Sequence, residues 1–256
     1  MNARLNYRIM GEGEPLLILH GLLGSHRNWL GFSRPLAQRY RVILVDLRNH
    51  GESEHCGSMG YAEMAGDITA LLDQLGIKRA TLIGHSMGGK VAMTCALLHP
   101  DRLRELIILD IAPVDYGSRF DALFDAMLAL PLEQISTRQE ADEHLARSVP
   151  ETMLRQSVLQ NLVRDAAGWR WRINIAAIKA ALAGIGGFPG FSAGHNYPER
   201  TLFIRAENSA YILPEHRSVI TQLFPAATIT DLAGAGHWLH LDQPQPLRDT
   251  ITHHLR

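Results

Sequence analysis

Seven short runs of apolar residues, rich in leucine and β-branched side chains, recur along the chain between glycines and polar turns. In the middle runs the apolar residues occupy consecutive positions, which is typical of strands covered on both faces of a parallel sheet. The pattern therefore predicts a mostly parallel sheet. The predicted strands are LNYRIM (5–10), PLLILH (15–20), YRVILVD (40–46), RATLIG (79–84), LRELIILD (103–110), TLFIRA (201–206) and ATITDL (227–232).

Segments with helical periodicity lie between these runs. In one of them Ile68, Leu71 and Leu75 fall on one face, and Gly76 supplies a stop signal. Alternation of strands and helices predicts right-handed βαβ units and hence an α/β fold with a doubly wound sheet. The predicted helices span residues 29–38, 64–76 and 87–98.

The alternation stops between residues 113 and 197. Helical periodicity dominates there, as in residues 120–130 and in residues 141–163, the latter interrupted at Pro150. A glycine-rich stretch at 183–195 leads back to the next strand. We predict a core made of residues 1–112 and 198–256, with residues 113–197 inserted as a helical cap over one end of the sheet.

Composition and charge exclude several classes of protein. The 256 residues include 25 Lys and Arg against 26 Asp and Glu, a formal charge of −1, so a nucleic-acid partner or a stable grip on an anionic membrane is not expected. The two cysteines, Cys56 and Cys95, are too few for a disulfide framework and lack the spacing of a zinc site. The first residues lack the apolar core of a signal peptide, and no apolar run reaches the about 20 residues of a membrane span. We expect a soluble, cytoplasmic protein.

The strongest chemical signal is the G-x-S-x-G motif at residues 84–88, which follows a predicted strand and opens a predicted helix. A sharp turn at this junction raises the backbone strain at Ser86 and leaves room only for glycine two residues away on either side. The turn also places Ser86 at a helix N-terminus, where the Met87 N–H can stabilise an oxyanion. We therefore predict Ser86 as the nucleophile.

A second oxyanion donor is expected in the segment HGLLGS at 20–25, which follows the strand 15–20. The N–H of Leu22 is the candidate, paired with that of Met87. For His20 we favour a role in shaping the loop over a role in proton transfer.

The general base is expected after the last strand. His237 lies in AGAGHW, directly after ATITDL, and the order of serine before histidine along the chain suits this fold. His240 is the nearest rival among 13 histidines, three residues further on in a predicted helix start.

Two carboxylates compete to orient the histidine. The usual position, after the strand 201–206, holds Ser209 where an acid would stand, and Glu207 lies two residues early. Asp110, at the carboxyl end of the strand 103–110, can also reach the far side of the imidazole. We favour Asp110 over Glu207, with Ser209 as a hydrogen-bonding fourth member of the site.

Together these motifs resemble the α/β-hydrolase superfamily over nearly the whole chain. The resemblance rests on HGLLGS, DLRNHGES at 46–53, GHSMGG at 84–89 and AGHWLHLDQP at 234–244. Within the superfamily, LDIAP, GWRWRIN and ENSAY resemble the YbfF-like subgroup of bacterial esterases and its mitochondrial relatives. This resemblance implies Ser86, Asp110 and His237 as catalytic residues with Ser209 beside them.

The resemblance also implies a reaction. It points to hydrolysis of a small-molecule acyl ester or thioester, acyl-CoA included, by a serine hydrolase that needs no metal or organic cofactor. The alternatives are a carbon–carbon bond hydrolase or a menaquinone-pathway-type lyase with the same triad, or a non-catalytic binding module. In residues 169–172 the alternation of tryptophan and arginine either contacts a ligand or packs the cap onto the core.

Overall fold

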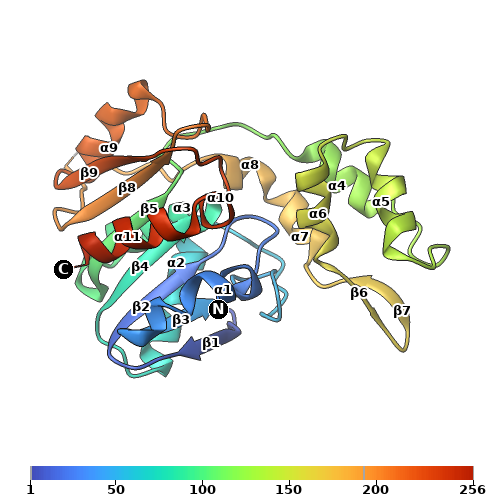
Figure 1. Cartoon of the computed structure of the whole chain (residues 1–256), viewed down its shortest axis with the longest axis horizontal. Helices are drawn as coiled ribbons and strands as arrows, with labels where there is room; N and C mark the ends of the chain where they lie inside the picture. Colours follow the sequence, from blue (N-terminus) through green and yellow to red (C-terminus); the bar gives the residue numbers. More distant parts are fainter. Residues whose placement is uncertain (1, 193, 256) are drawn as a thin grey trace.

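A seven-stranded, mostly parallel sheet forms the centre of the computed structural model, which describes residues 2–192 and 194–255 (Figure 1). The strand order is β1-β3-β2-β4-β5-β8-β9, and only β1 runs antiparallel to its neighbour. This sheet confirms the predicted fold class. The strands are β1 (Tyr7–Met10), β2 (Glu14–Leu19), β3 (Tyr40–Val45), β4 (Ala80–His85), β5 (Leu103–Leu109), β8 (Thr201–Ala206) and β9 (Ala227–Leu232).

Helices cover both faces of the sheet and divide its apolar side chains into two cores. In β2, Leu17 and Leu19 pack in the core beneath α2 and α3, whereas Leu16 and Ile18 pack in the core beneath α1 and α11. Because successive strand residues alternate between two buried faces, the strands read as continuous apolar runs. These core helices are α1 (Leu30–Ser33), α2 (Tyr61–Gln74), α3 (Met87–Leu98), α9 (Arg217–Leu223), α10 (Leu239–Asp242) and α11 (Pro244–His254), with 3₁₀ turns η1 (His26–Trp29), η2 (Leu36–Gln38), η3 (Pro100–Arg102) and η4 (Pro214–His216).

A separate lobe lies between β5 and β8 in the sequence and to the right of the sheet in Figure 1. It contains α4 (Asp121–Leu128), α5 (Arg138–Ala146), α6 (Thr152–Leu159), α7 (Ile175–Ala180) and α8 (Leu182–Gly186), together with the antiparallel pair β6 (Leu162–Asp165) and β7 (Gly168–Trp171). We call this lobe the cap. The hairpin departs from the expectation of a purely helical insertion, because the alternating tryptophans of β7 favour a strand and Gly168 adopts the positive φ of 114° that closes the turn.

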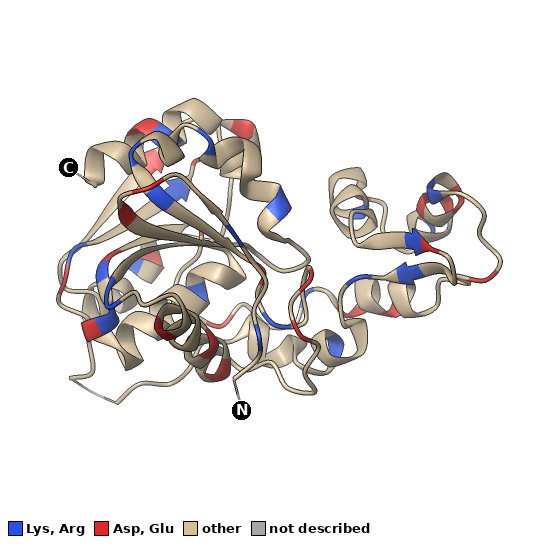
Figure 2. Ribbon diagram, turned by 90° about the horizontal axis from the view of Figure 1, so that it is seen from below, with Lys and Arg blue, Asp and Glu red and all other residues tan. Residues whose placement is uncertain are grey.

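The predicted helix at 29–38 is also divided, into η1, α1 and η2. Pro35 lies between the last two, where its ring is incompatible with a continuous helix. Across residues 2–192 and 194–255, no helix combines the length and apolar character needed to cross a membrane. Basic and acidic residues are interspersed along the ribbon of both the core and the cap (Figure 2).

Candidate active site

Ser86 occupies the turn between β4 and α3, in a strained conformation with φ 52° and ψ −119°. The turn is closely packed on both sides. A Cβ atom added to Gly84 would lie 2.3 Å from the Gly88 carbonyl oxygen, and one added to Gly88 would lie 2.5 Å from the Leu19 carbonyl oxygen. Both positions therefore require glycine, which is the physical basis of the G-x-S-x-G spacing.

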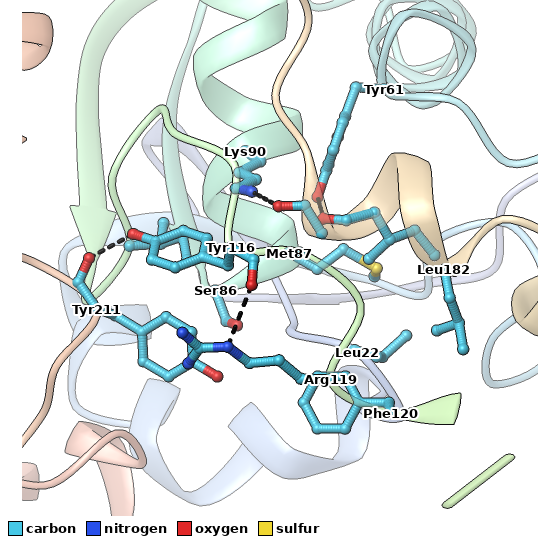
Figure 3. Close-up of a pocket in the computed structure, with 14 residues that line it drawn as sticks. Leu22, Tyr61, Ser86, Met87, Lys90, Tyr116, Arg119, Phe120, Leu182 and Tyr211 are labelled. Carbon is cyan, nitrogen blue, oxygen red and sulfur yellow. Dashed lines mark hydrogen bonds between the residues drawn. The ribbon is translucent and has the colours of Figure 1, made fainter. Parts of the chain in front are cut away.

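The two residues predicted to supply oxyanion donors, Leu22 and Met87, lie beside Ser86. Met87 is the first residue of α3, so its N–H has no acceptor within the helix. Leu22 follows β2 in a loop that touches the serine, since a Cβ added to Gly21 would lie 3.2 Å from the Ser86 Cβ. Leu22, Ser86 and Met87 line one pocket (Figure 3), as an oxyanion site requires.

His237 is hydrogen-bonded to Asp110, with 2.8 Å between Nδ1 and Oδ2. Asp110 is fully buried, and its other oxygen, Oδ1, accepts the Ala206 N–H at 3.1 Å. Because a carboxylate only accepts hydrogen bonds, Nδ1 of His237 carries the proton and Nε2 is left as the basic nitrogen. His237 and Ser86 line a common cleft, so the structure brings together the predicted nucleophile, base and acid.

Ser209 and Glu207, the two remaining polar candidates, make contacts with different parts of the site. The Ser209 hydroxyl donates to the same Asp110 oxygen that binds His237, and Ser209 Oγ accepts the Tyr211 N–H at 3.3 Å. Glu207 instead accepts the Gly234 N–H at 2.7 Å and is exposed. Glu207 therefore holds the turn that precedes His237, and Asp110 is the carboxylate on the imidazole.

The Ser209→Ala variant is expected to lower kcat about fivefold with KM unchanged, because one hydrogen bond worth about 1 kcal/mol no longer holds Asp110. Steady-state hydrolysis of a p-nitrophenyl ester measures this, with the exposed Ser218→Ala on α9 as the control. A loss of several hundredfold would instead assign Ser209 an essential part in the reaction.

Three other histidines near the site, His85, His240 and His20, make contacts that stabilise the structure around it. The Nε2–H of His85 donates to the His237 carbonyl at 2.8 Å, and burial holds the pKa of His85 well below its usual range. His240 stacks on Trp29 at 4.2 Å between ring centroids, and burial lowers its pKa to about 4. His20 Nε2 accepts the Leu47 N–H at 3.0 Å, which fixes the loop after β2.

The hairpin β6–β7 lies away from Ser86. The ring of Trp169 lies under the guanidinium groups of Arg138 and Arg164, at 6.0 and 5.6 Å. Arg172 forms an ion pair with Glu52 of the core, at 3.3 Å. Residues 169–172 do not line the described cavities at Ser86, so their contacts are those of packing within the cap and onto the core.

Sequence reasoning missed several residues that surround the serine. Tyr211 stacks on the His237 ring, with 4.1 Å between centroids. The Arg119 guanidinium lies 5.8 Å from the Tyr211 ring and lines the same pocket as Ser86 (Figure 3). These contacts join segments far apart in the sequence, so no local pattern indicates them. Lys90 could have been found, because it follows Ser86 by four residues and so lies on the same face of α3.

Lys90 connects α3 to both ends of the cap. Its ammonium group is buried and donates to the carbonyl oxygens of Val114, Gly186 and Gly187, at 2.9, 2.6 and 2.6 Å. Val114 precedes the first cap helix, and the two glycines end the last one. Burial lowers the pKa of Lys90 to about 7.

This lowered pKa predicts a pH-dependent stability. Between about pH 7 and pH 10 the unfolded chain holds a proton on Lys90 that the folded chain has lost, so folding becomes more favourable as pH rises through this range. The unfolding free energy of the wild type should therefore rise relative to that of Lys90→Met, by at most about 1.4 kcal/mol per pH unit. Urea unfolding measures it, with the exposed Lys78→Met as control. Parallel pH curves for wild type and Lys90→Met would contradict the prediction.

The pocket beside Ser86 is mostly apolar. It encloses about 480 Å³, part of it open to solvent, and its walls come from both core and cap. Apolar contributions include Leu22, Ile111, Phe120, Leu182 and Ile185. Among the described residues, no group of three or more His, Cys, Asp or Glu side chains is arranged to hold a metal ion.

The fold and this arrangement define a class of protein. The family model for the alpha/beta hydrolase fold matches residues 14–244, and the chain belongs to this family. The mouse sn-1-specific diacylglycerol lipase ABHD11 is 40% identical, with 97% of this chain and 84% of the mouse protein covered.

Within the family, the chain is a YbfF-like esterase relative. Esterase YbfF of Escherichia coli K12 is 36% identical, with 95% of this chain and 94% of the bacterial protein covered. A solved structure of a marine microorganism esterase is 35% identical and superposes with a TM-score of 0.94, covering 98% of this chain and 99% of that one. The chain is therefore grouped with α/β hydrolases that are named as esterases and lipases.

Proposed function

We propose that the protein is a serine carboxylesterase or thioesterase that hydrolyses short-to-medium acyl esters or acyl thioesters, acyl-CoA included, through an acyl-enzyme on Ser86. The observation that carries this proposal is the His237–Asp110 hydrogen bond of 2.8 Å, made by a histidine that shares a cleft with a serine on a strained turn. That arrangement supplies a nucleophile, a base and an orienting carboxylate.

In the first half-reaction, Ser86 Oγ attacks the acyl carbon while Nε2 of His237 takes the hydroxyl proton. The carbonyl oxygen becomes an oxyanion held by the N–H groups of Leu22 and Met87, a contact worth about 3 kcal/mol per donor to the barrier. The tetrahedral intermediate then collapses: the bond to the alcohol or thiol breaks, and His237 returns its proton to the departing oxygen or sulfur.

In the second half-reaction, a water molecule takes the place of the leaving group. His237 removes a proton from this water as its oxygen attacks the acyl-enzyme, and then protonates Ser86 Oγ as the carboxylic acid leaves. Asp110 stays ionised throughout and stabilises the imidazolium that forms twice in each cycle. No redox step or cofactor enters this sequence.

The apolar pocket supports the acyl-group part of the proposal. Leu182 and Ile185 come from α8 of the cap, whereas Met87 and Ile111 come from the core, so both parts enclose the chain of the acyl group. Each buried methylene contributes about 0.8 kcal/mol to binding, until the pocket is full. The names of the mouse and E. coli relatives, a lipase and an esterase, support ester bonds as the target.

The test is hydrolysis of p-nitrophenyl acetate, butyrate and octanoate and of butyryl-CoA, with fluorophosphonate labelling of the serine. We expect labelling, and turnover of the esters that peaks at a short or medium chain. Labelling without ester or thioester turnover, but with cleavage of a vinylogous diketone, would favour the carbon–carbon bond hydrolase; neither labelling nor turnover would favour a binding module.

A further inference from the structure

The predicted oxyanion donor Leu22 lies in residues 20–24, directly after β2, a segment that we call the donor loop. The carbonyl of Gly21 accepts the Gly24 N–H at 3.0 Å and the Nδ1–H of His20 at 2.8 Å. This carbonyl shares a trans peptide unit with the Leu22 N–H, and the two groups of such a unit point in opposite directions. The direction of the Leu22 N–H is therefore set by the contacts that hold the donor loop.

The next residue, Leu23, has a strained backbone. It is buried and adopts a positive φ of 64°, which is uncommon for any residue except glycine. A conformation of this kind persists only where the surrounding structure holds it. Both the N–H and the carbonyl of Leu23 are bound by side chains from distant parts of the chain, one from the core and one from the cap.

The core contributes His50, which belongs to the segment DLRNHGES at 46–53. Its Nε2 accepts the Leu23 N–H at 3.2 Å, and its Nδ1–H donates to the Arg48 carbonyl at 3.0 Å. The ring is fully buried, and burial lowers the pKa of His50 to about 3, so Nε2 stays unprotonated and able to accept. The segment 46–53 thus supplies the acceptor for the strained residue of the donor loop.

The cap contributes Asn161, which lies between α6 and β6. Its side chain is buried, and Nδ2 donates to the Leu23 carbonyl at 2.8 Å and to the Ser157 carbonyl at 3.5 Å. The backbone of Asn161 is fixed in turn, because its carbonyl accepts the Arg172 N–H at 2.8 Å. The cap is therefore attached to the donor loop at the residue that follows Leu22.

We propose that Asn161 and His50 are positioning residues for the reaction. By holding Leu23 in place, they direct the N–H of Leu22 at the oxyanion that forms on the substrate. This inference rests on the proposed function, because it assumes that an oxyanion forms when Ser86 attacks an acyl carbon. It gives the cap a part in the chemical step, in addition to its part in the wall of the acyl pocket.

Asn161→Ala tests the attachment to the cap. Displacing an oxyanion donor slows the chemical step without weakening the binding of a planar carbonyl, so kcat for p-nitrophenyl butyrate should fall about tenfold and KM should stay within about twofold. The matched control is Asn174→Ala. Asn174 also joins the cap to the core, but it donates to the Asn49 side chain at 3.2 Å and to the Cys56 carbonyl at 3.3 Å. This control should keep kcat within about twofold of the wild type, even where its stability falls.

Two variants of His50 separate its two hydrogen bonds. Glutamine reaches the position of Nε2 and can accept the Leu23 N–H, whereas asparagine reaches the position of Nδ1 and can donate only to the Arg48 carbonyl. We expect His50→Gln to keep kcat within about threefold of the wild type and His50→Asn to lower it about tenfold. Equal losses of kcat in the two variants would overturn the role of His50, since support of the fold alone does not distinguish them.

A transition-state analogue tests the cause of each loss. Ser86 Oγ adds to the carbonyl carbon of 1,1,1-trifluoroheptan-2-one, its proton passes to His237, and the ketone oxygen becomes an oxyanion. Heptan-2-one has the same chain and stays planar. In Asn161→Ala and His50→Asn the inhibition constant of the trifluoro ketone should rise about tenfold, in step with the loss of kcat, and that of heptan-2-one should not change.

The outcomes separate this inference from the proposed function. An unchanged kcat in Asn161→Ala, an equal loss in Asn174→Ala, or a loss of kcat without weaker inhibition by the trifluoro ketone overturns the inference and leaves the function intact. A wild type that neither hydrolyses the ester nor binds the trifluoro ketone removes both. Thermal unfolding shows whether each variant is folded at the assay temperature; if His50→Asn is not, the comparison of Asn161→Ala with Asn174→Ala decides.

Discussion

Ser86→Ala is expected to reduce hydrolysis of p-nitrophenyl butyrate by roughly 10⁴- to 10⁶-fold, the range seen when a triad nucleophile is removed. Without Oγ no acyl-enzyme forms, and only the oxyanion donors and substrate binding remain. KM should change little, because the apolar pocket is intact. Steady-state assays measure the rate, and a burst of p-nitrophenol from the wild type but not from the variant reports the lost acylation step.

The fold should tolerate this substitution. Alanine at position 86 keeps the strained φ of 52°, so its stability should match that of the wild type. Ser86→Gly relieves the strain and should raise the unfolding free energy by about 1 kcal/mol, with activity equally lost. A Ser86→Ala variant that retains a tenth of the wild-type rate would exclude Ser86 as the nucleophile.

The sheet and the nucleophile turn were predictable because their signals are local. Each parallel strand is buried on both faces, so its apolar run is visible without knowledge of its partners. The turn at Ser86 needs glycine at positions 84 and 88, because a Cβ atom there would clash with the backbone of the turn itself or of the end of β2. The same apolar runs predict where β5 and β9 end, and therefore where Asp110 and His237 lie relative to the sheet.

The cap was less predictable because tertiary contacts determine its elements. The hairpin β6–β7 is only four residues per strand, and the ring of Trp169 is contacted by Arg164 of the facing strand and by Arg138 of α5. The spacing of Lys90 from Ser86 could indicate which face of α3 it occupies, but the carbonyl groups at the two ends of the cap that accept its hydrogen bonds could not be predicted. Contacts across such long sequence separations leave no periodic signal.

Asp110→Asn is expected to lower kcat about 10⁴-fold by changing the tautomer of His237. The buried Asp110 carboxylate accepts from three donors: the Ala206 N–H on one oxygen, and His237 and Ser209 on the other. The Ala206 N–H is fixed in the backbone, so the asparagine oxygen should stay with it, and the amide NH₂ then faces the other two. The Ser209 hydroxyl can rotate to accept, but Nδ1 of His237 can accept only by losing its proton, which leaves Nε2 protonated and unable to activate Ser86.

Glu207→Gln is the matched control, since it makes the same change of charge at the rival carboxylate. The glutamine can still accept the Gly234 N–H through its amide oxygen, so the turn before His237 should persist and kcat should stay within about threefold of the wild type. A loss confined to Glu207→Gln would transfer the orienting role to that residue. Raising the pH should not rescue Asp110→Asn. Its defect is which nitrogen of His237 carries the proton, and a higher pH does not move that proton to Nδ1.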